Sequence, residues 1–214
     1  MPAERSEAAA HPRPALSPRS VVIGLVGGIA AGKTAVAQAF AAHGFEPVDA
    51  DRLARAVTAD AGVLGELAAA LGPDVVRDGA LDRAAVAERV FRDPAARARL
   101  EAITHPRIRV RILQALTTAR AHDRPALLDA PLLFEVGLEV FCDHVVFVHA
   151  SDAVRRSRAA GRGWAPEELA RREAAQLPLA AKRARADSTI DNDGDLGTMQ
   201  AQVAAVLATL RERA

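Results

Sequence analysis

The sequence predicts an α/β fold in which a five-stranded parallel sheet is covered by helices on both faces. Two observations support this prediction. Short apolar runs alternate along the chain with stretches of helical pattern, which is the order that βαβ units require. Runs such as HVVFVH are apolar at nearly every position, as expected of strands buried on both faces of a sheet. The expected strands are Val21–Val26, Phe45–Val48, Ala126–Leu128, Val145–His149 and Ser188–Ile190.

The first strand is followed by a glycine-rich loop and a helix. The loop, GGIAAGKT, has the spacing and the strand-to-helix context of a phosphate-binding P-loop. Its glycines allow backbone N–H groups to converge on an anion, and the helix start adds its positive dipole end. Lys33 is expected to reach the β- and γ-phosphates, and the Thr34 hydroxyl to bind Mg²⁺. The predicted nucleotide contacts are Gly28, Ile29, Ala30, Ala31, Gly32, Lys33, Thr34 and Ala35.

Acidic residues follow the second and third strands. Asp49 and Asp51 are expected to share one face of an extended segment, at the sheet edge where ligands bind. A carboxylate there can orient or deprotonate an attacking hydroxyl. We favour Asp51 for this role. Asp49 is the alternative, but it can also serve as the cap of the next helix. Asp129 ends the third strand, either as a Walker B acid that holds Mg²⁺ or as a turn residue. Glu135 is either a polar residue of a following helix or an acceptor contact.

Two long connections complete the expected layout. Residues 52–120 are helical and far longer than a parallel crossover needs, so they predict a helical lobe beside the sheet. Residues 151–186 combine helical pattern with clustered arginines and a Gly161–Gly163 hinge, which favours a lid with at least one catalytic arginine over a solvated helix face. The sheet core then comprises residues 19–51, 121–150 and 187–214. Residues 1–18 have no periodic apolar face and are expected to be a disordered tail ahead of the single domain at 19–214.

His105 and the polar stretch at residues 182–192 each allow two interpretations, one functional and one structural. His105 precedes Pro106, and proline disfavours helical geometry for the residue before it. We therefore expect a helix break that leaves His105 at a boundary, where it binds a phosphate or packs as an ordinary side chain. The other histidines have no partners at metal-ligand spacing, so no zinc site is predicted. A nucleotide base could be bordered by Lys182, Asp187 and Asn192. A strand followed by a turn explains these residues equally, and we favour that simpler interpretation.

The amino-acid composition limits the kinds of partner that this protein is expected to bind. The chain has 214 residues, of which 50% are hydrophobic and 26% charged, with a formal net charge of +1. So small a charge gives no general attraction to nucleic acid or anionic membranes. No apolar run approaches the roughly 18 residues of a membrane span, and the single cysteine cannot form an internal disulfide. We therefore expect a cytoplasmic protein with no nucleic-acid and no membrane partner.

The order of the motifs closely resembles that of one family. From about Val21 to Asn192 the chain reads GLVGGIAAGKT, VDADRLAR, ITHPRI, LLDAPLLFEVGL, R-x-x-x-R, Q-L-P-L-x-x-K-R-x-x-A-D and IDN. This series resembles the dephospho-CoA kinase family. The resemblance implies a three-layer α/β/α P-loop kinase core, an inserted helical acceptor lobe and a helical lid. It also implies ATP-dependent phosphorylation of the ribose 3′-hydroxyl of dephospho-CoA, giving CoA and ADP, with ATP and Mg²⁺ as cofactors.

The resemblance also implies roles for individual residues. Dephospho-CoA and ATP are the implied partners of a monomer or weak homo-oligomer. The implied catalytic residues are Asp51, Lys33, Arg158 and Arg162, the acceptor contacts Asp49, Asp51, His105, Leu132 and Glu135, and the metal ligands Thr34 and Asp129. The chain departs from the family pattern at Ala30 and Ala31 in the loop, at Arg107 in the HPRI motif, and at Arg155, where glutamine is common.

Two other functions remain open. Another small-molecule P-loop kinase, acting on a nucleoside or nucleotide, would share the core motifs. A nucleotide-binding switch is disfavoured because the chain has no guanine-specific N-K-x-D loop.

Overall fold

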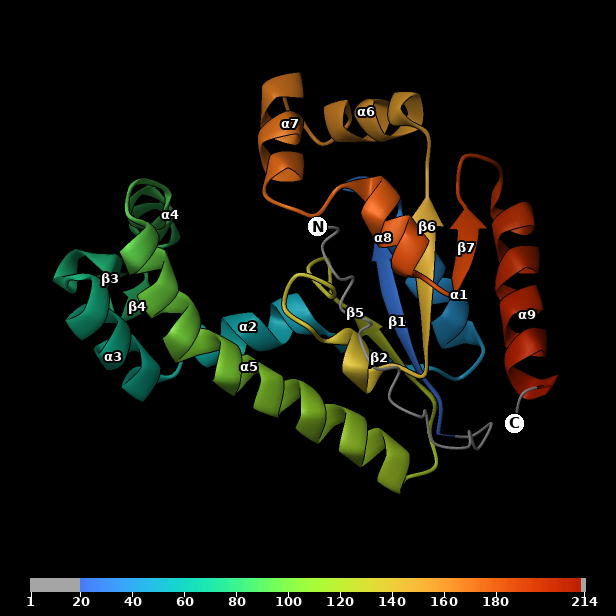
Figure 1. Ribbon diagram of the computed structural model, residues 1–214, viewed down its shortest axis with the longest axis horizontal. Helices are drawn as coiled ribbons and strands as arrows, with labels where there is room; N and C mark the ends of the chain where they lie inside the picture. Colours follow the sequence, from blue (N-terminus) through green and yellow to red (C-terminus); the bar gives the residue numbers. More distant parts are fainter. Residues whose placement is uncertain (1–19, 213–214) are drawn as a thin grey trace, which may run out of the picture.

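A central parallel sheet organises the molecule, with strand order β2-β5-β1-β6-β7 (Figure 1). The computed structural model describes residues 20–212, so the predicted tail at residues 1–18 lies outside the described residues. The strands are β1 (Val22–Gly27), β2 (Glu46–Asp49), β5 (Ala126–Asp129), β6 (His144–His149) and β7 (Ser188–Asp191). All five predicted strands are confirmed, and their boundaries differ from the prediction by no more than one residue.

Helices cover both faces of this sheet. On one face lie α1 (Lys33–Ala42) and α9 (Leu196–Glu212); on the other lie the C-terminal half of α5 (Pro94–Ala121) and the segment after β5. The alternation of β1 explains how one strand serves two layers, because Ile23 and Leu25 join the first core cluster while Val22 and Val26 join the second. These side chains are 0% exposed, and each contributes roughly 1.5–3 kcal/mol by burial. The predicted three-layer α/β/α fold is therefore confirmed.

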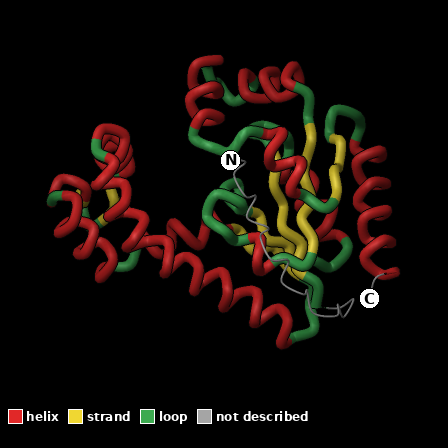
Figure 2. Tube along the Cα trace, viewed as in Figure 1, coloured by secondary structure: helices red, strands yellow, loops and turns green. Residues whose placement is uncertain are grey.

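The part of the chain between β2 and β5 forms a helical lobe that extends from the edge of the sheet (Figure 2). It contains α2 (Ala50–Thr58), α3 (Ala61–Leu71), α4 (Arg83–Arg92) and the first half of α5, with a 3-10 turn at Pro73–Val75. A short hairpin, β3 (Val76–Arg77) and β4 (Ala80–Leu81), turns at an Asp-Gly pair and was not predicted. The lobe has its own apolar core, which includes Val57, Leu67, Leu71, Val75 and Ala96.

Helix α5 runs without interruption through Pro106, so the predicted helix break is wrong. Packing explains the difference, since α2, α3 and α4 all contact this helix and Thr104 is buried beside the proline. The carbonyl that loses its donor to the proline belongs to Ala102, an exposed residue that solvent can satisfy.

Two of the helices after β6, α6 (Asp152–Ala160) and α7 (Pro166–Ala174), stand over the carboxyl ends of the strands (Figure 1). The third, α8 (Leu179–Arg185), lies against the sheet and contacts β1. The turn between α6 and α7 contains Gly163 at φ 77°, a left-handed conformation that glycine adopts readily. A further 3-10 turn spans Glu139–Phe141. Among residues 20–212, no helix has both the length and the apolar character to cross a membrane.

Candidate active site

The glycine-rich loop joins β1 to α1 and is tightly enclosed. Gly32, the residue before α1, has φ 89°, and a Cβ there would lie 2.2 Å from Asn192 Nδ2, so only glycine fits. Ala30 also has a left-handed backbone, φ 60°, which costs an alanine roughly 1–2 kcal/mol. Ala30 is buried in a cluster with Ala159 and Leu169 of the α6–α7 segment. The alanine that departs from the family pattern therefore packs its methyl group against the arginine-rich segment.

Lys33 and Asp129 form the electrostatic centre of the site. Burial lowers the pKa of Lys33, and the Asp129 carboxylate opposes this effect. Burial likewise raises the pKa of Asp129; Lys33 opposes the rise, while Asp49 and Asp51 add to it. Asp129 Oδ1 is buried and has no hydrogen-bond partner within residues 20–212. The orphaned Asp129 oxygen interacts with Lys33, and the exposed Thr34 follows Lys33 in the chain; oxygen donors of these two kinds suit a hard divalent cation.

Asp49 and Asp51 lie in different elements of secondary structure. Asp49 is the last residue of β2 and caps α2, accepting a hydrogen bond from Arg52 N at 2.9 Å. Asp51 lies in the first turn of α2, so the prediction that the two side chains share a face of an extended segment is wrong. The helix begins one residue after the strand ends, which rotates Asp51 away from Asp49. The alternative prediction that Asp49 caps the helix is confirmed.

Asp51 and His105 line two adjoining cavities. The first, of about 380 Å³, is walled by Ala50, Ala54, Pro106, Ile108, Arg109, Ala130, Pro131, Leu132, Val136 and Leu138. The second, of about 430 Å³, lies within the lobe and is lined by residues of α2, α4 and α5. The structure thus brings together Asp51, His105 and Leu132, which the family resemblance implied as acceptor contacts.

Glu135 lines neither cavity and lies in a turn, so the predicted helix at this position is wrong. Glu135 Oε1 accepts from Leu177 N at 2.8 Å and pairs with Lys182 Nζ at 2.8 Å. Lys182 is fully buried and also donates to Pro131 O at 2.7 Å and to Gln176 Oε1 at 2.9 Å. This cluster ties the segment after β5, which walls the first cavity, to the segment between α7 and α8.

The two implied lid arginines are placed differently. Arg158 donates to Ala31 O at 3.1 Å and to Asn192 O at 2.8 Å, and Asn192 Nδ2 donates to the same Ala31 O at 2.8 Å. Arg158 therefore holds the glycine-rich loop in place. Arg162 lies exposed in the turn after α6. Its side chain makes no hydrogen bond or ion pair within residues 20–212, and its charge helps to lower the pKa of Lys33. The sequence analysis considered Asn192 as a residue beside the nucleotide but favoured an ordinary strand and turn, and it did not predict this contact with the loop.

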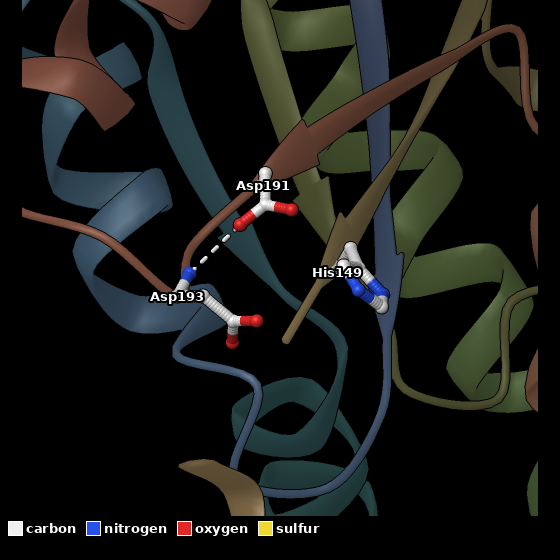
Figure 3. A group of neighbouring side chains, drawn as sticks. All are labelled: His149, Asp191 and Asp193. Carbon is white, nitrogen blue, oxygen red and sulfur yellow. Dashed lines mark hydrogen bonds between the residues drawn. The ribbon is translucent and has the colours of Figure 1, made fainter. Parts of the chain in front are cut away.

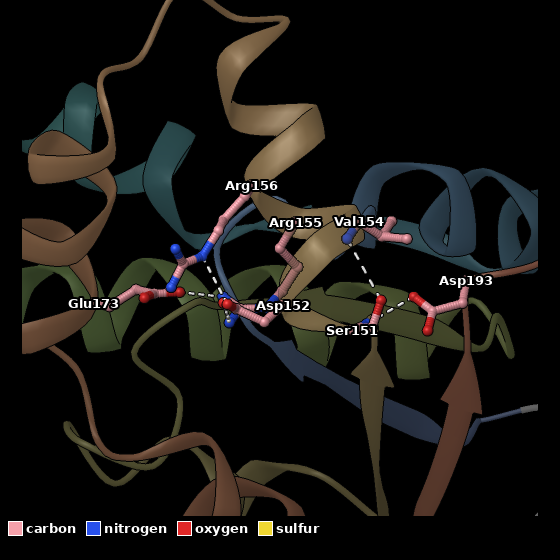
Figure 4. Close-up of polar contacts among 7 residues, drawn as sticks. All are labelled: Ser151, Asp152, Val154, Arg155, Arg156, Glu173 and Asp193. Atoms are coloured by element: carbon pink, nitrogen blue, oxygen red, sulfur yellow. Dashed lines mark hydrogen bonds and ion pairs between the residues drawn. The ribbon is translucent and has the colours of Figure 1, made fainter.

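Arg155 is buried where α6, α7 and the loop meet. Its guanidinium pairs with Glu173 of α7 and, at 3.1 Å, with Asp152, which also pairs with Arg156 at 2.6 Å (Figure 4). A Cβ on Gly28 would lie 3.1 Å from Arg155 Cδ. The arginine that departs from the family pattern therefore joins α6 to α7 beside the loop.

His149 has acidic neighbours that its own sequence surroundings do not show. The pairing of β6 with β7 places it opposite Asp191, and its ring and the carboxylates of Asp191 and Asp193 offer atoms within 4.8 Å of one another (Figure 3). These neighbours are brought together by strand pairing, so the spacing of residues in the sequence did not reveal them. Asp191 Oδ1 accepts from Asp193 N at 2.9 Å, and Asp193 Oδ1 accepts from Ser151 N at 2.7 Å. These contacts hold the turn that carries Asn192.

Comparisons with known proteins agree with this geometry. A family model described as dephospho-CoA kinase matches residues 21–198. The dephospho-CoA kinase of Anaeromyxobacter dehalogenans is 47% identical over 194 residues, covering 89% of this chain and 92% of the relative. That of Deinococcus radiodurans is 46% identical over 191 residues, covering 88% and 91%. The crystal structure of TT1252 from Thermus thermophilus matches with a TM-score of 0.79 at 36% identity, covering 89% of this chain and 97% of that one. A dephospho-CoA kinase structure from Campylobacter jejuni shares the fold, with a TM-score of 0.67 at 21% identity, covering 89% and 97%.

Proposed function

We propose residue roles for this chain, which belongs to the dephospho-CoA kinase family and phosphorylates dephospho-CoA with ATP to give CoA. One observation carries the proposal. Asp51 lines both cavities on the lobe side, and its charge also opposes the lowering of the pKa of Lys33 by burial and adds to the rise in the pKa of Asp129. A carboxylate in that position faces an acceptor on one side and the transferring phosphate on the other.

Asp51 accepts a hydrogen bond from the ribose 3′-hydroxyl and orients it in line with the γ-phosphorus of ATP. As the bond from the hydroxyl oxygen to phosphorus forms, the bond from phosphorus to the β-phosphate oxygen breaks, and the hydroxyl proton passes to the Asp51 carboxylate. The products are CoA and ADP. His105 and Leu132 border the acceptor beside Asp51, and their place in the first cavity supports this role.

Cationic side chains offset the charge that develops on the phosphates. Lys33 reaches the β- and γ-phosphates from the first turn of α1, and Arg162 approaches from the turn after α6. Arg158 acts by holding Ala31 in place. Glu135 acts by positioning the cavity wall through Lys182, and Asp49 by capping α2, which carries Asp51.

Mg²⁺ fits the oxygen donors of Thr34 and Asp129, and the unpartnered Asp129 Oδ1 supports this assignment. When bound, the ion neutralises charge on the β- and γ-phosphates.

We also propose a cytoplasmic location and a monomer or weak homo-oligomer. A single cysteine suits a reducing compartment.

The acceptor is tested by measuring coupled ADP release with dephospho-CoA, AMP, CMP and uridine. We expect rapid, saturable turnover with dephospho-CoA and little with the other three. Preference for a nucleoside or a nucleoside monophosphate would instead favour another P-loop kinase activity. Tight GDP binding without acceptor-dependent turnover would indicate a nucleotide switch.

A further inference from the structure

His149, Asp191 and Asp193 form a group of metal-ligating side chains that no step of the mechanism uses (Figure 3). His149 ends β6, Asp191 ends the neighbouring strand β7, and Asp193 follows in the turn before α9. One ligand atom from each side chain lies within 4.8 Å of the other two. The sequence alone predicted no zinc site, because strand pairing and not sequence spacing brings these residues together.

The two carboxylates of this group have no cation beside them. Asp191 Oδ1 accepts from Asp193 N, and Asp193 Oδ1 accepts from Ser151 N, so the second oxygen of each carboxylate is left for a ligand. Within residues 20–212, neither carboxylate forms an ion pair with a lysine, an arginine or a histidine. Two carboxylates this close repel each other, and a cation between them relieves the repulsion.

The imidazole of His149 supplies a donor of a different kind. The residue is partly buried, and its ring makes no hydrogen bond within residues 20–212. The ring and the carboxylates therefore converge without bonding directly to one another. Ligands of one tetrahedral Zn²⁺ lie roughly 3.4 Å apart. Small rotations about the last side-chain torsions of histidine and aspartate, which are soft, bring these donors to that spacing.

His149 lies on the face of the sheet opposite α1 and α9. Val148 belongs to the core cluster beneath those helices and Phe147 to the other cluster, so the alternation of β6 places His149 on the side of Phe147. There His149 borders a cavity of about 310 Å³ beside α8, which gives an ion a route of entry and room for a water ligand. Strand β1 separates β6 from β5, which carries Asp129, so this group is distinct from the oxygen donors assigned to Mg²⁺.

We propose that His149, Asp191 and Asp193 bind a divalent transition-metal ion such as Zn²⁺, and that the ion fixes the turn after β7. One imidazole nitrogen and two carboxylate oxygens are ligands that Zn²⁺ takes in tetrahedral sites with one open position, whereas Mg²⁺ prefers oxygen ligands alone. The ion joins β6 to both neighbours of Asn192, whose side chain holds the carbonyl of Ala31. The site thus links the edge of the sheet to the glycine-rich loop.

The test is calorimetric titration of Zn²⁺ into the untagged, nucleotide-free full chain. We expect one ion per chain with a Kd on the order of 1 μM, weaker than in closed sites because only three side chains coordinate. Millimolar Mg²⁺ should not compete. His149→Ala should weaken binding at least about a hundredfold. Asp191→Asn and Asp193→Asn should each weaken it about tenfold, because asparagine keeps an oxygen for the backbone amide but lacks the charge.

A second readout reports the turn itself. Zn²⁺ should slow amide hydrogen exchange at residues 191–194 in the wild type and should have no such effect in His149→Ala. A Tm near that of the wild type without metal shows that His149→Ala remains folded. If His149→Ala is not folded, the nearly isosteric Asp193→Asn gives the same comparison.

His43→Ala is the matched control. His43 is an exposed histidine directly after α1, and within residues 20–212 it belongs to no group of metal-ligating side chains. Its removal should leave the affinity for Zn²⁺ unchanged.

Three results would overturn the inference. Affinity for Zn²⁺ that stays within about threefold of wild type in His149→Ala, or that falls equally in His43→Ala, would indicate an adventitious ion only. Absence of binding at about 100 μM Zn²⁺ would do the same. The titration uses neither ATP nor an acceptor, so its failure is distinguishable from a failure of the proposed function.

Discussion

The Asn192 side chain, just after β7, donates through Nδ2 to the carbonyl of Ala31 in the phosphate-binding loop, 2.8 Å away. Both residues are buried, and the same carbonyl accepts from Arg158. The contact joins the nucleotide loop to the far end of the sheet and to α6. A motif that reads as an ordinary strand and turn therefore contacts the glycine-rich loop.

We predict that Asn192→Ala raises the KM for ATP about tenfold and lowers the free energy of unfolding by about 1–2 kcal/mol, because a buried acceptor loses one of its two donors. Calorimetric ATP titration and urea unfolding would measure the two effects. Gln202→Ala is the control, since Gln202 bonds to the Asp191 backbone in the same region without touching the loop. Unchanged ATP affinity in Asn192→Ala would show that the contact does not hold the loop.

Asp129→Asn should abolish most activity and yet stabilise the fold at neutral pH. Burial raises the pKa of Asp129 above its ordinary value, so the charged carboxylate is disfavoured in the folded state. A raised pKa means that the folded protein binds more protons, and the stability of the wild type falls as pH rises from the ordinary carboxyl range through the folded pKa. The Tm advantage of Asp129→Asn should therefore be complete above the folded pKa and vanish near pH 3.8. A lower Tm for the variant at pH 7 would contradict this account.

Lys182→Met should destabilise the protein by about 3–5 kcal/mol, since it leaves the Glu135 charge without its buried partner. The double variant Lys182→Met/Glu135→Gln keeps an acceptor for Leu177 N and removes the unpaired charge, so it should recover more than half of the loss. Urea unfolding measures the stability of the single and the double variant. Equal stability of the single and double variants would show that the Glu135 charge does not set the cost.

The features that could be predicted from the sequence are those that depend on residues close together in the chain. The five strands are apolar runs whose burial follows from their own residues, and the loop, Lys33 and Thr34 follow from one contiguous motif. The Asp49 cap was also predictable, because it depends on residues three positions apart.

The failure at Asp51 is local, because α2 begins directly after β2. Other features that the sequence did not predict depend on distant parts of the chain. The predicted break before Pro106 ignored three helices that pack against α5. Strand pairing brings Asp191 beside His149 although 42 positions in the sequence separate them. Arg155 and Lys182 are buried by elements that no local pattern connects to them, so only the folded structure shows their partners.

The most direct test of the proposed mechanism compares Asp51→Asn with Asp49→Asn in the rate of CoA formation at saturating ATP and dephospho-CoA. Asp51→Asn removes the proton acceptor and should lower kcat at least a hundredfold, which corresponds to about 2.7 kcal/mol, with ATP affinity retained. Asp49→Asn preserves a capping side chain and should keep kcat within about threefold. Near-wild-type turnover by Asp51→Asn, or an equal loss in both variants, would contradict the role assigned to Asp51.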